Sequence, residues 1–304
     1  MTRLGVKSPA GLTLGHALLA LAVVIVWGTN FVVIKLALGH LPPLLFATLR
    51  FTIAAVPAVF FLPRPAVPLR ELALYGILIG VGQFGLLFIA MNGHIAPGLA
   101  SLVVQSQVFF TIGLAMYFNG EQLRPVQALS LALGALGIGM IGWHSGGATS
   151  LGGVALVLGA ALGWAGGNMV QRRAVGINML SYVVWSSLFA VPPLALLSLY
   201  LEGWPAIAAG FANASATTWA AVVWQSVGNT MFGYAAWGWL LTRHPASTVA
   251  PLSLLVPVFG MATAAWWLGE TLPAWKLEAA VLVLGGLALN LLWPRFARRF
   301  RPAV

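Results

Sequence analysis

The sequence contains no cysteine and no aspartate, and five glutamates stand against fifteen lysines and arginines in 304 residues. The missing cysteines exclude disulfides and thiolate metal sites. Charged residues make up only 7% of the chain, whereas a soluble domain carries about 25%. The shortage of charge therefore excludes a soluble globular protein.

The side-chain sets that enzymes need are also missing. There is no HExxH motif, no phosphate-binding Walker loop, no Ser-His-Asp arrangement and no sizeable soluble segment to carry one. The five histidines, at positions 16, 40, 94, 144 and 244, stand at the ends of apolar runs or between them. We therefore expect neither an enzyme nor a protein with a metal or a cofactor. No carboxylate stands in the middle of an apolar run, so no proton relay is visible.

Hydrophobic residues make up 60% of the chain and fall into long runs. A helix that crosses about 30 Å of hydrocarbon needs roughly 20 apolar residues, so each run can form one transmembrane span. Backbone polar groups in lipid must pair within their segment, which predicts helices, and the alternation typical of a barrel is absent. The ten predicted spans are 13–38, 42–62, 70–92, 96–118, 124–143, 151–172, 178–201, 216–241, 246–268 and 274–293.

The basic residues predict how the chain is oriented. In a soluble protein the net charge of +10 would suggest nucleic acid as a partner, but here the charges lie in short loops between apolar runs. With ten spans, Lys35 and Lys276 fall on one side and Arg50 falls within a span. All the others fall on the opposite side, which predicts cytoplasmic termini and no nucleic-acid partner. These are Arg3, Lys7, Arg64, Arg70, Arg124, Arg172, Arg173, Arg243, Arg295, Arg298, Arg299 and Arg301.

The second half of the chain repeats features of the first. Each half holds five spans, an odd number, so the second half enters the membrane from the opposite side. This predicts an inverted-topology repeat, with units at 1–143 and 151–293 and a basic cytoplasmic tail at 294–304. The matched segments are WGTN at 27–30 and WAGGN at 164–168, GQ at 82–83 and GN at 228–229, and NGEQL at 119–123 and LGETL at 268–272.

These motifs resemble the EamA family of the drug/metabolite transporter superfamily. The resemblance rests on Trp-Gly-x-x-Phe at 27–31, Leu-Arg-Phe at 49–51 and the two Gly-Glu-x-Leu elements after the fourth and ninth spans, and it covers nearly the whole chain. It implies a ten-helix carrier of small metabolites with both termini in the cytoplasm. The 13 Trp and 16 Phe residues make the chain most similar to bacterial amino-acid exporters, including those for aromatic amino acids.

Amides and aromatic residues stand in the middle of several spans, where polar groups are costly unless they face inward. Trp27 shares a helix face with Asn30, and Trp164 with Asn168. An indole could form an apolar platform and an amide could orient a zwitterion, while hydrogen bonding between helices is the alternative. The candidate substrate-binding residues are Trp27, Asn30, Gln83, Gln107, Trp164, Asn168, Asn229 and Tyr234.

Three further residues are candidates for charged or gating contacts. Arg50 could contact a substrate carboxylate, although a structural pair with backbone carbonyls or a glutamate is the favoured interpretation. Glu278 either pairs with Lys276 or faces an outer vestibule. Pro257, together with Pro251, is expected to interrupt its span and free a backbone carbonyl.

Two local expectations concern glutamates and glutamines. Glu121 and Glu270 are interpreted as structural caps or gate contacts, because an acidic side chain is favoured near a helix N-terminus. Gln105 and Gln107 should not both face one cavity, since two residues turn an α-helix by about 200°.

The sequence therefore predicts a secondary transporter that exports small amphipathic metabolites, with amino acids favoured, by alternating access around a central cavity. The alternatives are a flippase for lipids or lipid-linked metabolites and a non-transporting membrane scaffold. The expected partners are the small-molecule substrate and membrane lipid, and the expected location is the bacterial cytoplasmic (inner) membrane as a multi-pass protein. Inverted-repeat carriers can work as monomers, so no oligomer is required.

Overall fold

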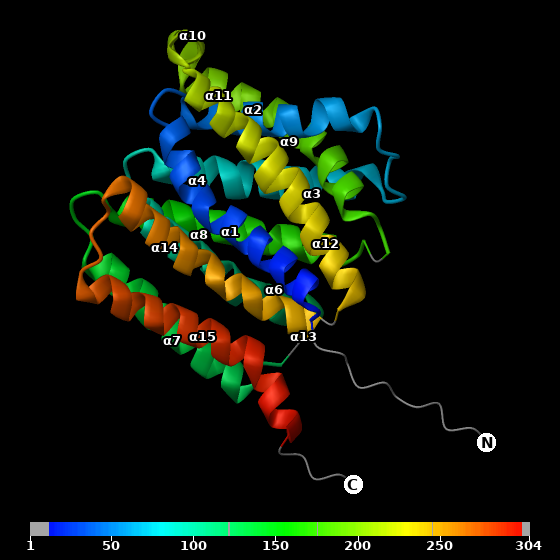
Figure 1. Ribbon diagram of the computed structural model, residues 1–304, viewed down its shortest axis with the longest axis vertical. Helices are drawn as coiled ribbons and strands as arrows, with labels where there is room; N and C mark the ends of the chain where they lie inside the picture. Colours follow the sequence, from blue (N-terminus) through cyan, green and yellow to red (C-terminus); the bar gives the residue numbers. More distant parts are fainter. Residues whose placement is uncertain (1–11, 121, 175, 245, 300–304) are drawn as a thin grey trace.

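The computed structural model describes residues 12–120, 122–174, 176–244 and 246–299. Within these ranges the chain is helical, and its one extended contact is an isolated bridge between Gly146 and Thr149. Figure 1 shows the helices packed side by side. The first half holds α1 (Leu14–Ala37), α2 (Pro43–Val59), α3 (Leu69–Ile77), η1 (Leu78–Gly85), α4 (Leu86–Met91), α5 (Pro97–Val103), η2 (Val104–Ser106), α6 (Gln107–Asn119) and α7 (Pro125–Trp143). The second half holds α8 (Leu151–Gln171), α9 (Met179–Leu201), α10 (Gly203–Asn213), α11 (Ala216–Val223), η3 (Trp224–Phe232), α12 (Gly233–Arg243), α13 (Ala246–Val249), η4 (Ala250–Leu254), α14 (Leu255–Leu268) and α15 (Ala274–Arg299).

The described residues contain eight helices that are long and apolar enough to cross a membrane. A ninth is obtained if α10 and the helix from Ala216 to Arg243, which meet at 104°, count as one broken span. α2 is apolar but has only 17 residues. α10 was not predicted, because its 11 residues are too few to form a span. α15 continues through 294–299, the first part of the predicted tail, and 300–304 lie outside the described residues.

Matched sequence motifs end helices in matched geometry. Gly120 and Gly269 stop α6 and α14 in the left-handed conformation, at φ of 65° and 66°. Glycine adopts this conformation without the steric cost that a Cβ brings. At the N-termini of two other helices, a side-chain oxygen accepts a backbone N–H of the first turn: Ser150 does so for α8 and Asn178 for α9.

Irregular helical segments interrupt four of the predicted spans, near the centre of the third, fourth and eighth and near the beginning of the ninth. The third and eighth runs contain the π-helical segments η1 and η3, and the fourth and ninth contain the 3₁₀ segments η2 and η4. The third and fourth runs correspond to the eighth and ninth in the predicted repeat, so each type of irregularity occurs once in each half. Such segments shift side chains from their regular helical directions and are frequent at functional sites.

The core is built between the two halves of the chain. α7 packs along α15, α1 along α14, and α2 along α9, so each pair joins a helix from before residue 144 with one from after residue 150. The α7–α15 and α1–α14 pairs lie side by side in Figure 1. Small residues allow this close approach: Ser130 of α7 is buried and its hydroxyl donates to the Gly286 carbonyl of α15 at 2.5 Å.

A close approach between α8 and η1 gives a first prediction. A Cβ added to Gly163 of α8 would lie 2.7 Å from the carbonyl carbon of Gly82 and 2.9 Å from the backbone nitrogen of Gln83. These are backbone atoms of η1 and cannot rotate away. We expect Gly163→Ala to lower stability by about 1–3 kcal/mol, the usual cost of overpacking, measured as the thermal unfolding midpoint in detergent.

Gly139 of α7 provides the matched control, because a Cβ there would meet nothing within 4 Å. Alanine is the better helix former by about 1 kcal/mol, so Gly139→Ala is expected to keep or slightly raise the midpoint. Equal midpoints for the two variants would show that the α8–η1 approach does not constrain the fold.

Candidate functional site

A cavity of about 790 Å³ lies among α1, α8, α12 and the irregular segments of the interrupted spans. No Asp, Glu, Lys, Arg or His is among the described residues that line it. The lining is instead rich in indoles, amides and aliphatic side chains. It includes all eight predicted substrate-binding candidates: Trp27, Asn30, Gln83, Gln107, Trp164, Asn168, Asn229 and Tyr234.

The cavity extends from the middle of the helices to one end of the bundle. Asn178 at the start of α9, Thr242 near the end of α12 and Ala250 of η4 all line it. This is the end where α1 begins, because the ring of His16 meets the edge of Trp239, another lining residue, at a centroid distance of 5.0 Å.

Trp27 is held against the wall that η3 and α12 form. Its indole Nε1 donates to the Asn229 carbonyl at 3.3 Å. Its ring centroid lies 5.9 Å from that of Tyr234 and 5.2 Å from that of Trp237. One hydrogen bond and two aromatic contacts therefore fix the indole as part of a rigid apolar wall.

Gln107 and Asn168 meet across the cavity wall, where the Asn168 Nδ2 donates to the Gln107 Oε1 at 3.0 Å. The neighbouring Gln105 also lines the cavity. The expectation that only one of these glutamines faces it is therefore wrong. The α-helical turn on which it rested is broken here, because the 3₁₀ segment η2 separates α5 from α6 and redirects the side chains.

Two amide oxygens beside the cavity have no hydrogen-bond partner. Asn30 and Gln83 are each only 4% exposed, and neither the Asn30 Oδ1 nor the Gln83 Oε1 accepts a hydrogen bond within the described part of the chain. Buried polar atoms are normally paired, and an unpaired one is costly. Both residues line the cavity, but these two oxygens are themselves fully buried, so they lie within the packed wall and not on its open surface.

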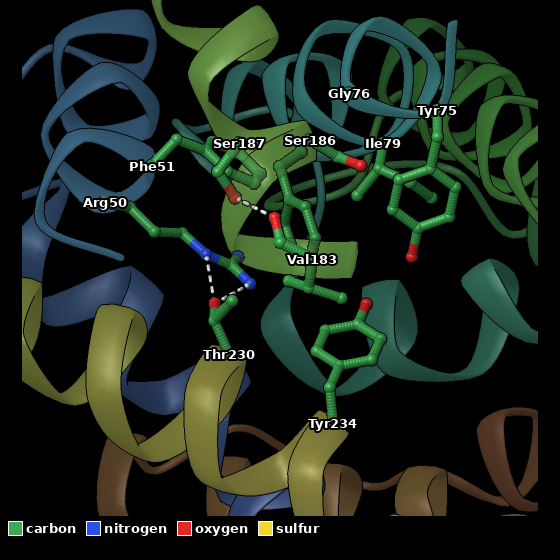
Figure 2. A pocket seen from close by; sticks show the side chains of 11 residues that line it. Arg50, Phe51, Tyr75, Gly76, Ile79, Val183, Ser186, Ser187, Thr230 and Tyr234 are labelled. Carbon is green, nitrogen blue, oxygen red and sulfur yellow. Dashed lines mark hydrogen bonds between the residues drawn. The ribbon is translucent and has the colours of Figure 1, made fainter. Parts of the chain in front are cut away.

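Arg50 lies behind the cavity wall and does not line the large cavity. It is fully buried, and it lines a separate small pocket together with Thr230 and Tyr234 (Figure 2). Its partners are the Asn229 Oδ1, the Thr230 hydroxyl and the ring of Phe84. The side chain is thus held by an amide, a hydroxyl and an aromatic face, where the sequence favoured backbone carbonyls or a glutamate.

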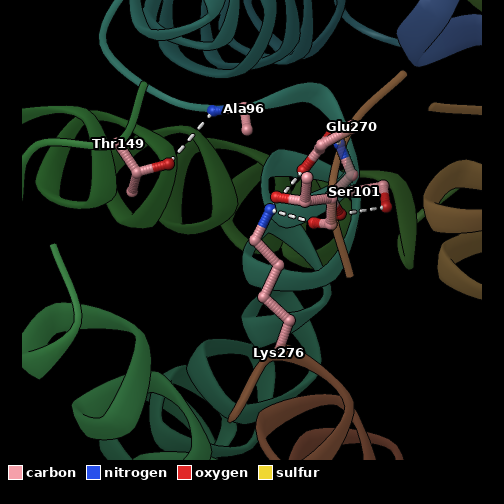
Figure 3. A network of polar contacts seen from close by, with 7 residues as sticks. Ala96, Ser101, Thr149, Glu270 and Lys276 are labelled. Carbon is pink, nitrogen blue, oxygen red and sulfur yellow. Dashed lines mark hydrogen bonds and ion pairs between the residues drawn. The ribbon is translucent and has the colours of Figure 1, made fainter. Parts of the chain in front are cut away.

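The other charged and gating candidates lie outside the large cavity. Glu278 is exposed on α15, and its expected partner Lys276 instead binds the Glu270 carboxylate at 3.0 Å (Figure 3). Pro257 is buried in the first turn of α14, directly after η4. The interruption of this span therefore falls at 250–254, where Pro251 stands at the beginning of the 3₁₀ segment.

Glu270 has the predicted role of a cap, although the helix it caps belongs to the first half of the chain. Its Oε2 accepts the backbone N–H of Gly98 at 3.0 Å, at the start of α5. Nearby, the Ala96 N–H donates to the Thr149 hydroxyl at 3.3 Å (Figure 3). These contacts close the bundle at the end away from His16. Glu121, the matched residue, lies outside the described residues.

Several cavity residues escaped prediction from the sequence. Trp237 follows Tyr234 by three residues and so shares its helix face, which was a usable signal. Asn178 and Gln171 stand at helix ends, where polar residues are ordinary and carry no special meaning. Ser253 of η4 lines the cavity only because the helix is interrupted there.

An all-helical bundle with eight or nine candidate spans around a cavity that reaches one end is a multi-pass membrane protein of transporter architecture. The family model described as "EamA-like transporter family" matches the chain twice, at 14–143 and 151–292. The chain therefore belongs to this family, which confirms the resemblance found in the sequence motifs.

Named relatives cover nearly the whole chain. A "Probable amino-acid metabolite efflux pump" of Salmonella typhimurium is 44% identical, with 93% of this chain and 97% of the relative aligned. A protein of the same name from Escherichia coli is 41% identical over 94% and 96%. A solved crystal structure with 19% identity covers 93% of this chain and 98% of its own, with a TM-score of 0.62, which supports the fold alone.

Proposed function

We propose that the protein exports amino acids or closely similar metabolites across the bacterial inner membrane. The observation that carries this proposal is the cavity of about 790 Å³, which is lined by indoles and amides and has no ionised side chain in its described lining. Such a lining suits a small solute with an apolar part and a net charge near zero. The efflux-pump names of the two relatives favour the same class of substrate.

We propose that transport occurs by alternating access in a ten-span inverted repeat. The two matched segments, the paired π and 3₁₀ interruptions and the paired left-handed glycines all support two related halves. α2 and the helix from Ala216 to Arg243 then complete the ten spans. With both termini in the cytoplasm, the cavity reaches the cytoplasmic end, so the state described here is inward-open.

The flippase alternative gains no support from the cavity. A lipid phosphate calls for Lys or Arg in the binding site, and neither type is among the described lining residues. If the protein were a non-transporting scaffold, the polar groups gathered around one cavity would have no function.

The test is transport by purified protein in liposomes. Vesicles loaded with unlabelled amino acid should take up the labelled form by counterflow, and a panel of the twenty standard amino acids should contain at least one substrate. Because no carboxylate that could carry a proton is among the described residues of the lining, uptake should be the same with and without a pH gradient. No uptake of any amino acid above protein-free vesicles would defeat the proposed function.

A further inference from the structure

Arg50 combines full burial with the absence of a carboxylate partner. Its Nη2 donates to the Asn229 Oδ1 at 3.1 Å and to the Thr230 hydroxyl at 2.9 Å, and its Nε donates to the same hydroxyl at 3.2 Å. Among the described residues the one ion pair is Lys276–Glu270, so the guanidinium charge of Arg50 is not neutralised there. Burying a charge in this way is costly, and ionisable residues that are kept inside membrane spans usually serve a function.

The guanidinium lies directly behind the wall of the large cavity. Its Cζ is 3.5 Å from the ring centroid of Phe84, and Phe84 and Asn229 both line that cavity. Figure 2 shows the Arg50 side chain reaching Thr230, on the helix that also carries Tyr234. A positive charge is thus placed one side chain away from a bound solute, in surroundings that screen it weakly.

Arg50 also fixes which way the Asn229 amide points. Because the Oδ1 accepts from the guanidinium, the amide NH₂ is left as the group that Asn229 can offer to the cavity. Within the described part of the chain, that NH₂ is neither hydrogen-bonded nor among the fully buried unpaired atoms. Asn229 is therefore held as a donor, and its donor strength is increased by the adjacent cation.

The neighbouring amides of Asn30 and Gln83 expose no acceptor oxygen to the cavity. The Asn30 Oδ1 and the Gln83 Oε1 are acceptors without partners. Asn30 belongs to α1, which packs against η3, the segment that carries Asn229. Among these three amides, the Asn229 NH₂ is the group that is backed by a positive charge.

We infer that Arg50 is a positioning residue that makes Asn229 the donor for the substrate carboxylate. The substrate class is then a small solute with a free carboxylate, such as an α-amino acid. This inference rests on the proposed function and adds to it the orientation of the substrate and the residue that sets it.

The test compares inhibitors of counterflow by purified protein in liposomes. The probes are the amino acid that is transported best in the panel, its carboxamide and its des-amino acid, each unlabelled. The wild-type protein should bind the carboxamide more weakly than the amino acid by about tenfold or more, as expected for loss of a charge-assisted hydrogen bond. The ratio of the affinities for the amino acid and the des-amino acid, which both carry the carboxylate, is the reference.

Asn229→Asp is the decisive variant. It keeps a partner for Arg50, now as an ion pair, but replaces the donating NH₂ with a second acceptor oxygen. The preference for the free carboxylate over the carboxamide should fall about tenfold or reverse, while the preference over the des-amino acid is retained. Arg50→Gln should lower the same carboxylate preference by raising the KM for the amino acid while changing the inhibition constant of the carboxamide little.

Thr230→Val is the matched control. It removes the hydroxyl that binds two atoms of Arg50 but leaves the Arg50–Asn229 contact in place. Thr230→Val should lower the unfolding midpoint and leave the carboxylate preference unchanged. If Arg50 had only a structural role, Asn229→Asp and Arg50→Gln would also leave that preference unchanged.

Unchanged carboxylate preference in folded Asn229→Asp and Arg50→Gln proteins would overturn the inference while leaving amino-acid transport established. Absence of any amino-acid flux in the wild-type protein would overturn the proposed function and this inference together, and that result is recognised in the panel before any variant is made.

Discussion

Replacing Glu270 with alanine is expected to destabilise the folded protein by about 3–5 kcal/mol, the usual effect of removing one partner from a buried ion pair. The side chains of Lys276 and Glu270 are only 9% and 10% exposed. The variant would leave the Lys276 ammonium with a single oxygen partner, the Thr271 carbonyl at 2.8 Å. It would also leave the Gly98 N–H at the start of α5 without its acceptor. The measurement is the thermal unfolding midpoint in detergent.

Glu278→Ala is the matched control, because Glu278 is an exposed glutamate close to the same lysine in sequence. Surface substitutions of this kind change stability by about 0.5 kcal/mol or less. Removing both charges in Glu270→Ala with Lys276→Met should recover part of the loss, because no uncompensated charge is then buried. Equal midpoints for Glu270→Ala and Glu278→Ala would show that the buried pair does not hold the fold together.

The same contact has a consequence for transport. Glu270 lies in the loop after α14, and its carboxylate binds the start of α5, so it ties the two halves together at the end of the bundle away from His16. In an alternating-access cycle this end must open, and the Glu270–Gly98 hydrogen bond must then break. A variant that lacks the carboxylate should therefore favour the outward-open state as well as unfold more easily.

Much of the architecture was predictable because a lipid environment leaves few choices. Long apolar runs must be helical, since backbone groups have no other partners in hydrocarbon, and helical segments occupy every predicted run. The same physics explains why the candidate residues face the interior: an amide such as Asn30 or Asn229 is costly in lipid. The inward position of the Trp27 and Trp164 indoles followed because each shares a helix face with an asparagine.

What was not predictable depends on contacts between residues far apart in the chain. The hydrogen-bond partners of the Arg50 guanidinium are about 180 positions away in the chain, and no periodicity in α2 indicates them. Lys276 is closer in sequence to Glu278, yet the bend after Gly269 brings Glu270 to it. The shared orientation of Gln105 and Gln107 required the helix to be broken at η2, and apolar sequence alone does not indicate such a break.

Trp27→Ala is expected to reduce amino-acid flux per folded molecule at limiting substrate roughly 30-fold or more, since truncating an aromatic anchor of a binding site costs about 2 kcal/mol or more. Trp27 lines the cavity and packs against Tyr234 and Trp237, so its loss would remove apolar contact area and loosen the wall beside Asn229. The measurement is counterflow of the best substrate of the panel, normalised to the amount of folded protein in the vesicles.

Trp185→Ala is the control that separates transport from stability. Trp185 of α9 is half-buried like Trp27, and its indole Nε1 also donates to a backbone carbonyl, that of Leu62 at 3.1 Å, but it does not line the cavity. Both substitutions should therefore lower the unfolding midpoint by similar amounts, whereas only Trp27→Ala should reduce flux. If the protein were a scaffold without transport activity, the two variants would differ from the wild type in stability alone. A normal flux per folded Trp27→Ala molecule would show that the indole is not part of the substrate site.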